Sequence, residues 1–186
     1  MEKQKLSDIA EIFTGVRIDR YNSTVGKPYP VIKKTFSENT TQIECETEMF
    51  SEKLDEKYLS KKDDIIIFLL DPTKVTKLNK EGLVISMSYA VIRPKKEYDP
   101  TFITYLLKSD QFTRELNRLV VGTNMRFMRS GYIKDIKLSI PQYKEQKTIG
   151  ELLKLLERKN NLYTQSIELN NKIQTLTQEK EELNKN

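Results

Sequence analysis

Histidine and tryptophan are absent from this 186-residue chain, and cysteine occurs once. The missing histidine removes the side chain that most often serves as a general base or metal ligand near neutral pH. Cys45 alone can form no internal disulfide and cannot supply a structural zinc site. No glycine-rich phosphate loop occurs among the six glycines. These absences argue against catalysis by the chain and against a cofactor or metal, and they fit a reducing cytoplasm.

Long apolar runs are missing as well. No stretch of eighteen apolar residues exists to span a bilayer, and the charged N-terminus MEKQKLSDIA lacks the apolar core of an export signal. We therefore expect a cytoplasmic protein without a membrane partner. The whole net charge of +5 lies in residues 1–150, because residues 151–186 carry equal numbers of acidic and basic side chains. A basic body suggests a polyanion partner, although a solvated basic surface explains this modest charge equally well.

The C-terminal segment is dominated by a leucine at every seventh residue, and residues 151–186 contain neither proline nor glycine. This spacing is typical of a helix that packs along a second helix. The predicted dimerisation residues are Leu152, Leu155, Leu162, Leu169, Ile173, Leu176 and Leu183. The simplest partner is a second copy of the chain, and a long surface helix lying on its own domain is the alternative. The spacing does not separate parallel from antiparallel pairing.

The remaining patterns mix both kinds of secondary structure. Helices are expected over residues 5–15, over 101–119 and from Tyr143 onward. Strands are expected at Tyr29–Lys33, Gln42–Met49, Asp64–Leu70, Leu83–Arg93 and Ile136–Ile140. This order predicts an α+β fold, with a mixed globular domain over residues 1–142 and a long coiled-coil helix over residues 143–186.

Three polar, basic segments are candidates for contact with nucleic acid. The loop 122–131 carries short hydrogen-bonding groups and two arginines, which suit phosphates or guanine edges, and two further arginines share one face of the preceding helix. A second segment follows the first expected helix. A third segment joins the Asp64–Leu70 strand to the Leu83–Arg93 strand. The candidates are Thr14, Gly15, Arg17, Lys74, Lys77, Arg114, Arg118, Thr123, Asn124, Arg126 and Arg129. Each segment alone also fits an ordinary solvated surface.

Carboxylates offer a separate hypothesis, a magnesium-dependent nuclease. Asp63 and Asp64 precede an apolar strand, and Glu44, Glu46 and Glu48 alternate along another. Adjacent strand residues point to opposite faces, so the two aspartates are not expected to converge. The alternating glutamates share a face that resembles a solvated edge.

Taken together, the order of elements resembles the specificity (S) subunit of type I restriction–modification systems. The matching segments are KLSDIAEIFTG, YLSKKDDIIIF, DPTFITYLLKSDQF before GTNMRF, and IKDIKLSIPQYKEQKTIGELL. The second segment has Lys-Asp-Asp where the family typically has a Gly-Asp turn. The most specific match combines Ile140, Pro141, Glu145, Gln146 and Ile149 ahead of a long helix.

The resemblance implies a DNA target recognition domain with a small curved sheet, followed by one spacer helix. Such a subunit does no chemistry, and it places methyltransferase (M) and restriction (R) subunits on a chosen double-stranded DNA sequence. Full-length members carry two such units whose helices form an antiparallel coiled coil, whereas this chain has one unit. Two copies would therefore read a bipartite palindrome, and pairing with a different half is the alternative. Loop position in the family adds Lys108 to the DNA-contact set. The competing function is a stand-alone dimeric DNA-binding regulator.

Overall fold

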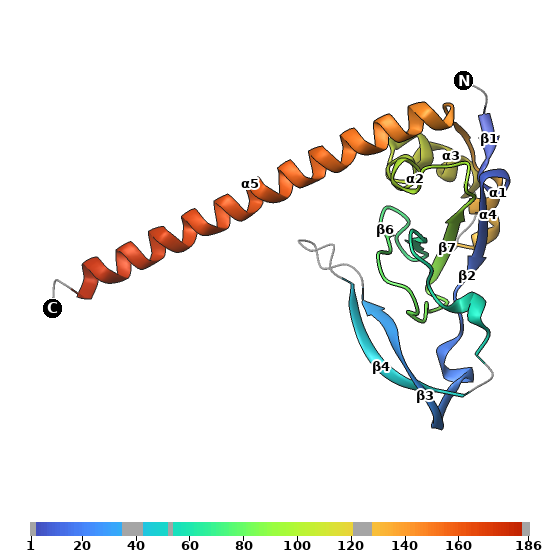
Figure 1. The fold of residues 1–186 in the computed structure, drawn as a ribbon, viewed down its shortest axis with the longest axis horizontal. Coiled ribbons are helices and arrows are strands. Elements are labelled where there is room, and N and C mark those ends of the chain that lie inside the picture. Colours follow the sequence, from blue (N-terminus) through green and yellow to red (C-terminus); the bar gives the residue numbers. More distant parts are fainter. Residues whose placement is uncertain (1–2, 35–42, 52–53, 121–127, 184–186) are drawn as a thin grey trace. The chain divides into compact units, whose positions relative to one another are not determined.

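The computed structural model describes residues 3–34, 43–51, 54–120 and 128–183 (Figure 1). Contacts divide the chain into two compact units, Met1–Gly150 and Glu151–Asn186. The second unit consists of most of α5, the long helix Tyr143–Leu183, which was expected from Tyr143 onward. The first unit holds every strand and all of the shorter helices. This mixed α+β architecture with small antiparallel sheets and a long C-terminal helix confirms the predicted fold class.

A four-stranded antiparallel sheet forms the centre of the first unit, with the strand order β2-β7-β5-β6. The strands are β2 (Ala10–Thr14), β7 (Tyr89–Pro94), β5 (Ile65–Phe68) and β6 (Val75–Lys77). The register pairs Thr14 with Ala90 and Phe68 with Tyr89, so the C-terminal ends of β2 and β5 lie at the same end of the sheet as the start of β7.

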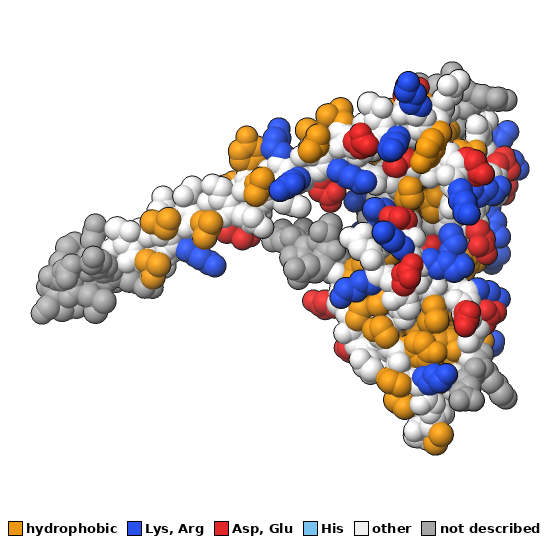
Figure 2. Space-filling model, viewed as in Figure 1, with side chains coloured by type: hydrophobic (Ala, Val, Ile, Leu, Met, Phe, Trp, Pro, Cys, Tyr) orange, Lys and Arg blue, Asp and Glu red, His pale blue; other side chains and the backbone are white. Residues whose placement is uncertain are grey.

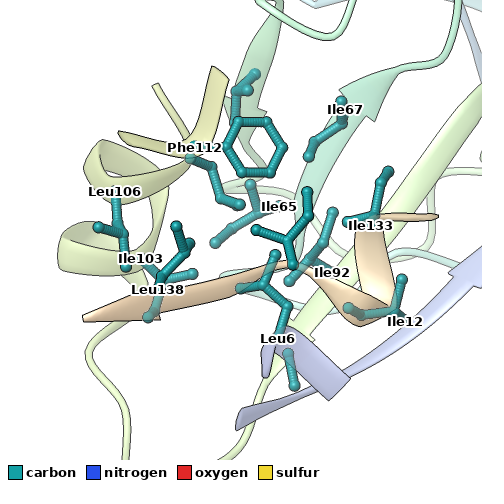
Figure 3. Packing of buried hydrophobic residues seen from close by; sticks show 14 of the residues in the cluster. Leu6, Ile12, Ile65, Ile67, Ile92, Ile103, Leu106, Phe112, Ile133 and Leu138 are labelled. Carbon is teal, nitrogen blue, oxygen red and sulfur yellow. The ribbon is translucent and has the colours of Figure 1, made fainter. Parts of the chain in front are cut away.

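The central strand β5 is buried on both faces, as its continuous run of isoleucines predicts. Ile65 and Ile67 belong to the main core, whereas Ile66 packs into a second cluster on the opposite face. Figure 3 shows side chains from the sheet meeting side chains from several helices in the main core. Phe112, which is buried from solvent, lies in this main core.

Four short helices supply the other side of the main core: α1 (Leu6–Ile9), α2 (Pro100–Leu107), α3 (Asp110–Val120) and α4 (Ser130–Asp135). Asp99 caps α2 by accepting a hydrogen bond from Phe102 N at 2.8 Å. Two two-stranded sheets complete the unit. Their strands are β1 (Lys3–Lys5), β8 (Lys137–Ser139), β3 (Asn22–Lys34) and β4 (Glu44–Phe50), and two 3-10 turns, η1 (Ile18–Arg20) and η2 (Glu56–Tyr58), lie between strands.

The Ile-Pro-x-x-x-Glu-Gln-x-x-Ile motif anchors the beginning of α5. Gln146 is buried, its Oε1 accepts a hydrogen bond from Asp99 N at 3.0 Å, and its Nε2 donates to Pro141 O at 2.9 Å. Ile149 packs against the main core. Gly150 leaves room for Asp99, because a Cβ there would lie 2.6 Å from Asp99 Oδ1. The motif therefore joins the first turns of α5 to the N-terminus of α2.

Several expected elements were wrong in extent or type. The expected helix over residues 5–15 is helical only in α1 and then continues as β2, because the pairing of β2 with β7 outweighs the helical spacing. The expected helix over residues 101–119 is two helices, since Ser109 accepts from Phe112 N and begins α3 anew. Both helices keep the predicted apolar spacing because they cover the same core.

Two further differences concern strands. The expected strand Leu83–Arg93 is regular only in β7, because the backbone of Leu83–Ser88 bonds instead to Ser60, Pro30 and Val16. The connection carrying Lys74 and Lys77 was expected to project like a finger, but it contains β6 and belongs to the sheet. The strands expected at Tyr29–Lys33 and Ile136–Ile140 are confirmed as part of β3 and as β8. The strand expected at Gln42–Met49 is confirmed from Glu44 onward as β4, and Gln42 lies outside the described residues.

Candidate nucleic-acid interface

One end of the four-stranded sheet gathers segments that lie far apart in the sequence. Beyond β5, Leu69 N donates to Ser88 O at 2.9 Å, and Leu69 O accepts from Met128 N at 3.0 Å. From β2, Thr14 Oγ1 donates to Ser130 Oγ at 2.8 Å. These bonds bring together the end of β2, the β5–β6 turn and the described end of the 122–131 segment. We call the surface made by Thr14, Arg17, Leu70, Lys74, Met87 and Arg129 the sheet-end surface.

Gly15 is a packing residue within this arrangement. Its N–H donates to Tyr89 O at 3.0 Å, and a Cβ would lie 2.3 Å from both Ile85 O and Ser86 O. Only glycine permits so close an approach of two backbones. The fold therefore requires glycine at position 15. The neighbouring Thr14 hydroxyl forms the hydrogen bond that ties β2 to α4.

The three cations of the sheet-end surface differ in their partners. Arg17 is exposed and its Nη2 lies 2.8 Å from Asp19 Oδ2, a hydrogen-bonded pair that holds the pKa of Asp19 below its ordinary value. Lys74 is half-exposed and its Nζ lies 3.7 Å from Asp71 Oδ2. Arg129 is exposed immediately before α4, and it forms no ion pair with any residue that the structure describes. Arg129 is thus available to an external anion.

Lys77 lies at the opposite end of β6 from Lys74. Its Nζ contacts Asp63 Oδ1 at 3.0 Å, beside the turn that leads into β5. Asp63 has a φ of 67°, the left-handed region that favours glycine. This is the turn where the family resemblance places glycine, and aspartate tolerates the same backbone better than most other residues. Lys77 therefore supports this turn, and the structure does not bring it to the sheet-end surface.

Helices α2 and α3 carry another basic group. Lys108, at the C-cap of α2, and Arg114 on α3 are exposed, and Arg118 is exposed with its Nη1 3.2 Å from Glu115 Oε1. Lys3 shares Glu115, and its hydrogen bond is the main cause that lowers the pKa of Glu115. Helix α3 packs on β8 and on α4, whereas α2 packs on β6 and on α3. The predicted residues Thr123, Asn124 and Arg126 lie outside the described residues.

The two aspartates proposed for a nuclease, Asp63 and Asp64, are engaged in structural contacts. Asp64 is fully buried, and its two oxygens accept hydrogen bonds from Arg93 Nε and Nη2, each at 2.8 Å. Its Oδ2 also accepts from Lys61 N at 2.8 Å. Asp64 in turn raises the pKa of Arg93 through the same hydrogen bonds. Within the described residues, no group of three or more Asp, Glu or Cys side chains is arranged to hold a metal ion.

The predicted dimerisation residues form an exposed row on α5. Leu152, Leu155, Leu162, Leu169, Ile173 and Leu176 are 57–65% exposed, and Leu183 lies in the helix beyond the side chains that are described. Figure 2 shows hydrophobic side chains exposed along this helix. Sequence reasoning missed a neighbouring row made by Leu156, Tyr163 and Ile167, which are also exposed. The leucine heptad drew attention away from this row because its three residues do not repeat at a single spacing.

Sequence reasoning also missed two apolar members of the sheet-end surface, Leu70 and Met87, which are 54% and 45% exposed. Leu70 was expected at the end of one strand and Met87 within another. Exposed apolar side chains at a tight turn have no periodic signal, so only the tertiary structure identifies them. No helix of the described part is both long and apolar enough to cross a membrane.

Comparisons with known proteins agree with this geometry. The specificity subunit of the type I restriction enzyme MjaVIII from Methanocaldococcus jannaschii is 36% identical over 62 residues, which are 33% of this chain and 15% of that protein. The solved HsdS subunit from Thermoanaerobacter tengcongensis is similar over 87% of this chain and 43% of its own length, with a TM-score of 0.64 and 18% identity.

A further solved chain comes from work on complex assembly and conformational transition of a type I R-M system. It has a TM-score of 0.67 and 15% identity over 87% of this chain and 43% of its own length. At such identities the two solved chains establish the fold alone. The present chain spans less than half the length of either one.

The family assignment depends on sequence over nearly the whole chain. The model of the type I restriction modification DNA specificity domain matches residues 1–181. That range covers the first unit with its sheet-end surface and almost all of α5. The chain therefore belongs to the type I restriction–modification DNA specificity family.

Proposed function

We propose that this chain is the non-catalytic reader of a cytoplasmic type I restriction–modification complex. In this proposal residues 1–142 form the target recognition domain and residues 143–186 the spacer and dimerisation helix. The domain binds double-stranded DNA and positions methyltransferase subunits, and through them the restriction subunit. The sheet-end surface and the cations of α2 and α3 are the proposed DNA contacts, because arginine and lysine bind phosphates and hydroxyl groups reach base edges. No step requires a cofactor or metal from this chain.

The observation that carries the proposal is the exposed apolar row of α5. Each side chain of the row is more than half exposed, so a folded monomer leaves several leucines in water. Burying one leucine contributes about 1.5–3 kcal/mol, so pairing of two such rows is strongly favourable. We propose that a second copy supplies the partner helix.

The relative orientation of the two paired helices can be inferred from the polar residues between the leucines. Lys159 and Ser166 occupy the seam positions that alternate with the leucines. In a parallel in-register pair, each Lys159 would face the Lys159 of the partner, and like charges would repel inside the seam. In an antiparallel pair, the same lysine faces a leucine and directs its ammonium group to the edge. We therefore propose an antiparallel pair.

An isologous pair places two identical readers about a two-fold axis, so the proposed target is a bipartite palindrome. The helix has 41 residues, which corresponds to a length of about 60 Å at 1.5 Å per residue. Its length would set the number of unread base pairs between the two half-sites. Pairing with a different half would give an asymmetric target instead.

Mapping methylated bases across the genome, with and without the gene, tests the specificity role. We expect a bipartite palindromic motif to disappear when the gene is deleted. An asymmetric motif would indicate that the partner is a different half rather than a second copy. Unchanged methylation would contradict the proposed function. Sequence-specific binding by the purified chain without methyltransferase subunits would then favour a stand-alone regulator.

The seam is tested by replacing Leu162, Leu169 and Leu176 together with aspartate. Six charges in one dimer seam should leave folded monomers, as measured by light scattering and circular dichroism. The matched control places aspartate at Thr164, Asn171 and Gln178, which lie two residues further along and face away from the row. The control should remain dimeric. A leucine variant that stays fully dimeric would show that pairing does not use this row.

A further inference from the structure

The sheet-end surface includes two exposed apolar side chains, Leu70 and Met87. Leu70 lies in the turn closed by Asp71 N donating to Phe68 O at 3.1 Å, and Met87 lies in the turn closed by Tyr89 N donating to Ser86 O at 3.0 Å. The bond from Leu69 N to Ser88 O, 2.9 Å long, joins the two turns. Leu70 and Met87 therefore belong to adjacent turns at one end of the sheet.

Cations surround this pair through the same backbone network. Met87 N donates to Val16 O at 2.8 Å, which places Arg17 beside one turn, and Met128 N donates to Leu69 O, which places Arg129 beside the other. Lys74 O accepts from Phe68 N at 3.1 Å across the β5–β6 turn. Asp19 and Asp71 accompany two of the three cations, so the rim keeps a positive balance.

Short hydroxyl side chains fill the remaining rim. Ser86 and Ser88 lie in the Met87 turn, with their Oγ atoms 3.4 Å apart, and Thr14 bonds to Ser130 on the opposite side. Cations and hydroxyl groups around an apolar centre match the major groove of DNA, where phosphates flank base edges and each thymine presents a C5-methyl group. A protein partner would need a larger continuous apolar surface than two side chains provide.

We propose that Leu70 and Met87 read the C5-methyl groups of thymine in the half-site. Both are about half covered, so they form a shallow apolar surface that suits methyl contact better than insertion between bases, which needs a projecting side chain. The inference depends on the proposed function, and it names the chemical group that this part of the reader distinguishes.

The test uses the complex of this chain with its methyltransferase subunits and DNA carrying the motif found by methylation mapping. Thymines of the half-site are replaced one at a time by deoxyuridine, which lacks only the methyl group. We expect at least one replacement to weaken binding about fourfold, the effect of removing about 0.8 kcal/mol of buried methyl contact. In the variants Leu70→Ser and Met87→Ser, thymine and uracil should bind equally at that position.

The control variant is Tyr105→Ser, which changes a side chain of similar exposure on α2 and should leave the thymine preference intact. The inference would be overturned if the unchanged complex bound every deoxyuridine half-site as tightly as the thymine half-site, or if the half-site contained no thymine. The mapped motif would still support the proposed function in either case. Loss of methyltransferase subunits from the Leu70→Ser and Met87→Ser complexes, with the thymine preference retained, would identify the surface as a protein contact. Absence of any mapped motif would instead refute the proposed function itself.

Discussion

The Asp64–Arg93 pair shows how one residue can seem catalytic in the sequence and be structural in the fold. Asp64 is fully buried, and Arg93 and Lys61 occupy both of its oxygens. A buried carboxylate is tolerated when it is paired and hydrogen-bonded in this way. The pair joins β7 to the turn before β5 and leaves no open carboxylate for a magnesium ion at this position.

Replacing Asp64 by asparagine is predicted to lower the free energy of unfolding by about 3–5 kcal/mol, because the Arg93 charge loses its buried partner. Urea denaturation measures the change. The control is Glu11→Gln, which removes an exposed carboxylate whose Oε2 lies 3.9 Å from Arg93 Nη1 and should cost less than about 1 kcal/mol. Equal effects of the two substitutions would contradict a structural role for the buried pair.

Residue chemistry was predictable where it depends on local pattern. The start of the helix expected from residue 101 is confirmed, because Asp99 caps α2 there. Exposure of Arg17, Arg114 and Arg118 also agrees with their choice as surface cations. The role of Gly15 was not predictable, since the backbone it approaches comes from Ile85 and Ser86, about seventy residues further along the chain. Such close approaches are set by tertiary pairing, which no local pattern contains.

At the scale of elements, the first turns of α5 depend on one buried amide. Gln146 bonds to Asp99 N and Pro141 O and is 2% exposed. Gln146→Ala would leave both backbone groups without these partners, and we predict a loss of about 1–3 kcal/mol in the free energy of unfolding. Urea denaturation measures the loss, and the control is Gln142→Ala, which changes an exposed glutamine nearby. Indistinguishable midpoints would rule out the anchoring role.

Elements with a strong local pattern were predicted well, whereas several short elements without such a pattern were not. The long helix and the apolar strand β5 follow from continuous periodicity or burial over their whole length. The strands β2 and β6 and the helix α4 span at most six residues each, too few for a period to stand out. Their type is decided by the neighbours they pair with. The candidate site depends on those short elements, so its composition was predicted only in part.

For the whole molecule, the proposed ruler makes a geometric prediction. Inserting a second copy of residues 162–168 after Glu168 keeps the leucine spacing and lengthens the helix by about 10.5 Å, close to three base pairs of B-DNA. In an antiparallel pair, methylation mapping should then find the same half-sites with about three more base pairs between them. An unchanged spacing would mean that the helix does not set the distance.

A five-residue insertion at the same place provides the matched control. It turns the downstream leucines by about 140° relative to those before the insertion. The two halves of the row then point in different directions, and pairing should fail. Light scattering on the purified chain measures this loss independently of any DNA target.

The sheet-end surface is held in shape mainly by main-chain hydrogen bonds, together with the side-chain bond from Thr14 to Ser130. The bonds at Leu69, Met87 and Met128 involve only backbone atoms, and the required glycine is buried beneath them. Substitutions at Leu70, Met87 or Arg129 therefore leave the scaffold intact. Under the proposed function, single exchanges at these positions would change the DNA sequence that is read while the supporting backbone stays the same.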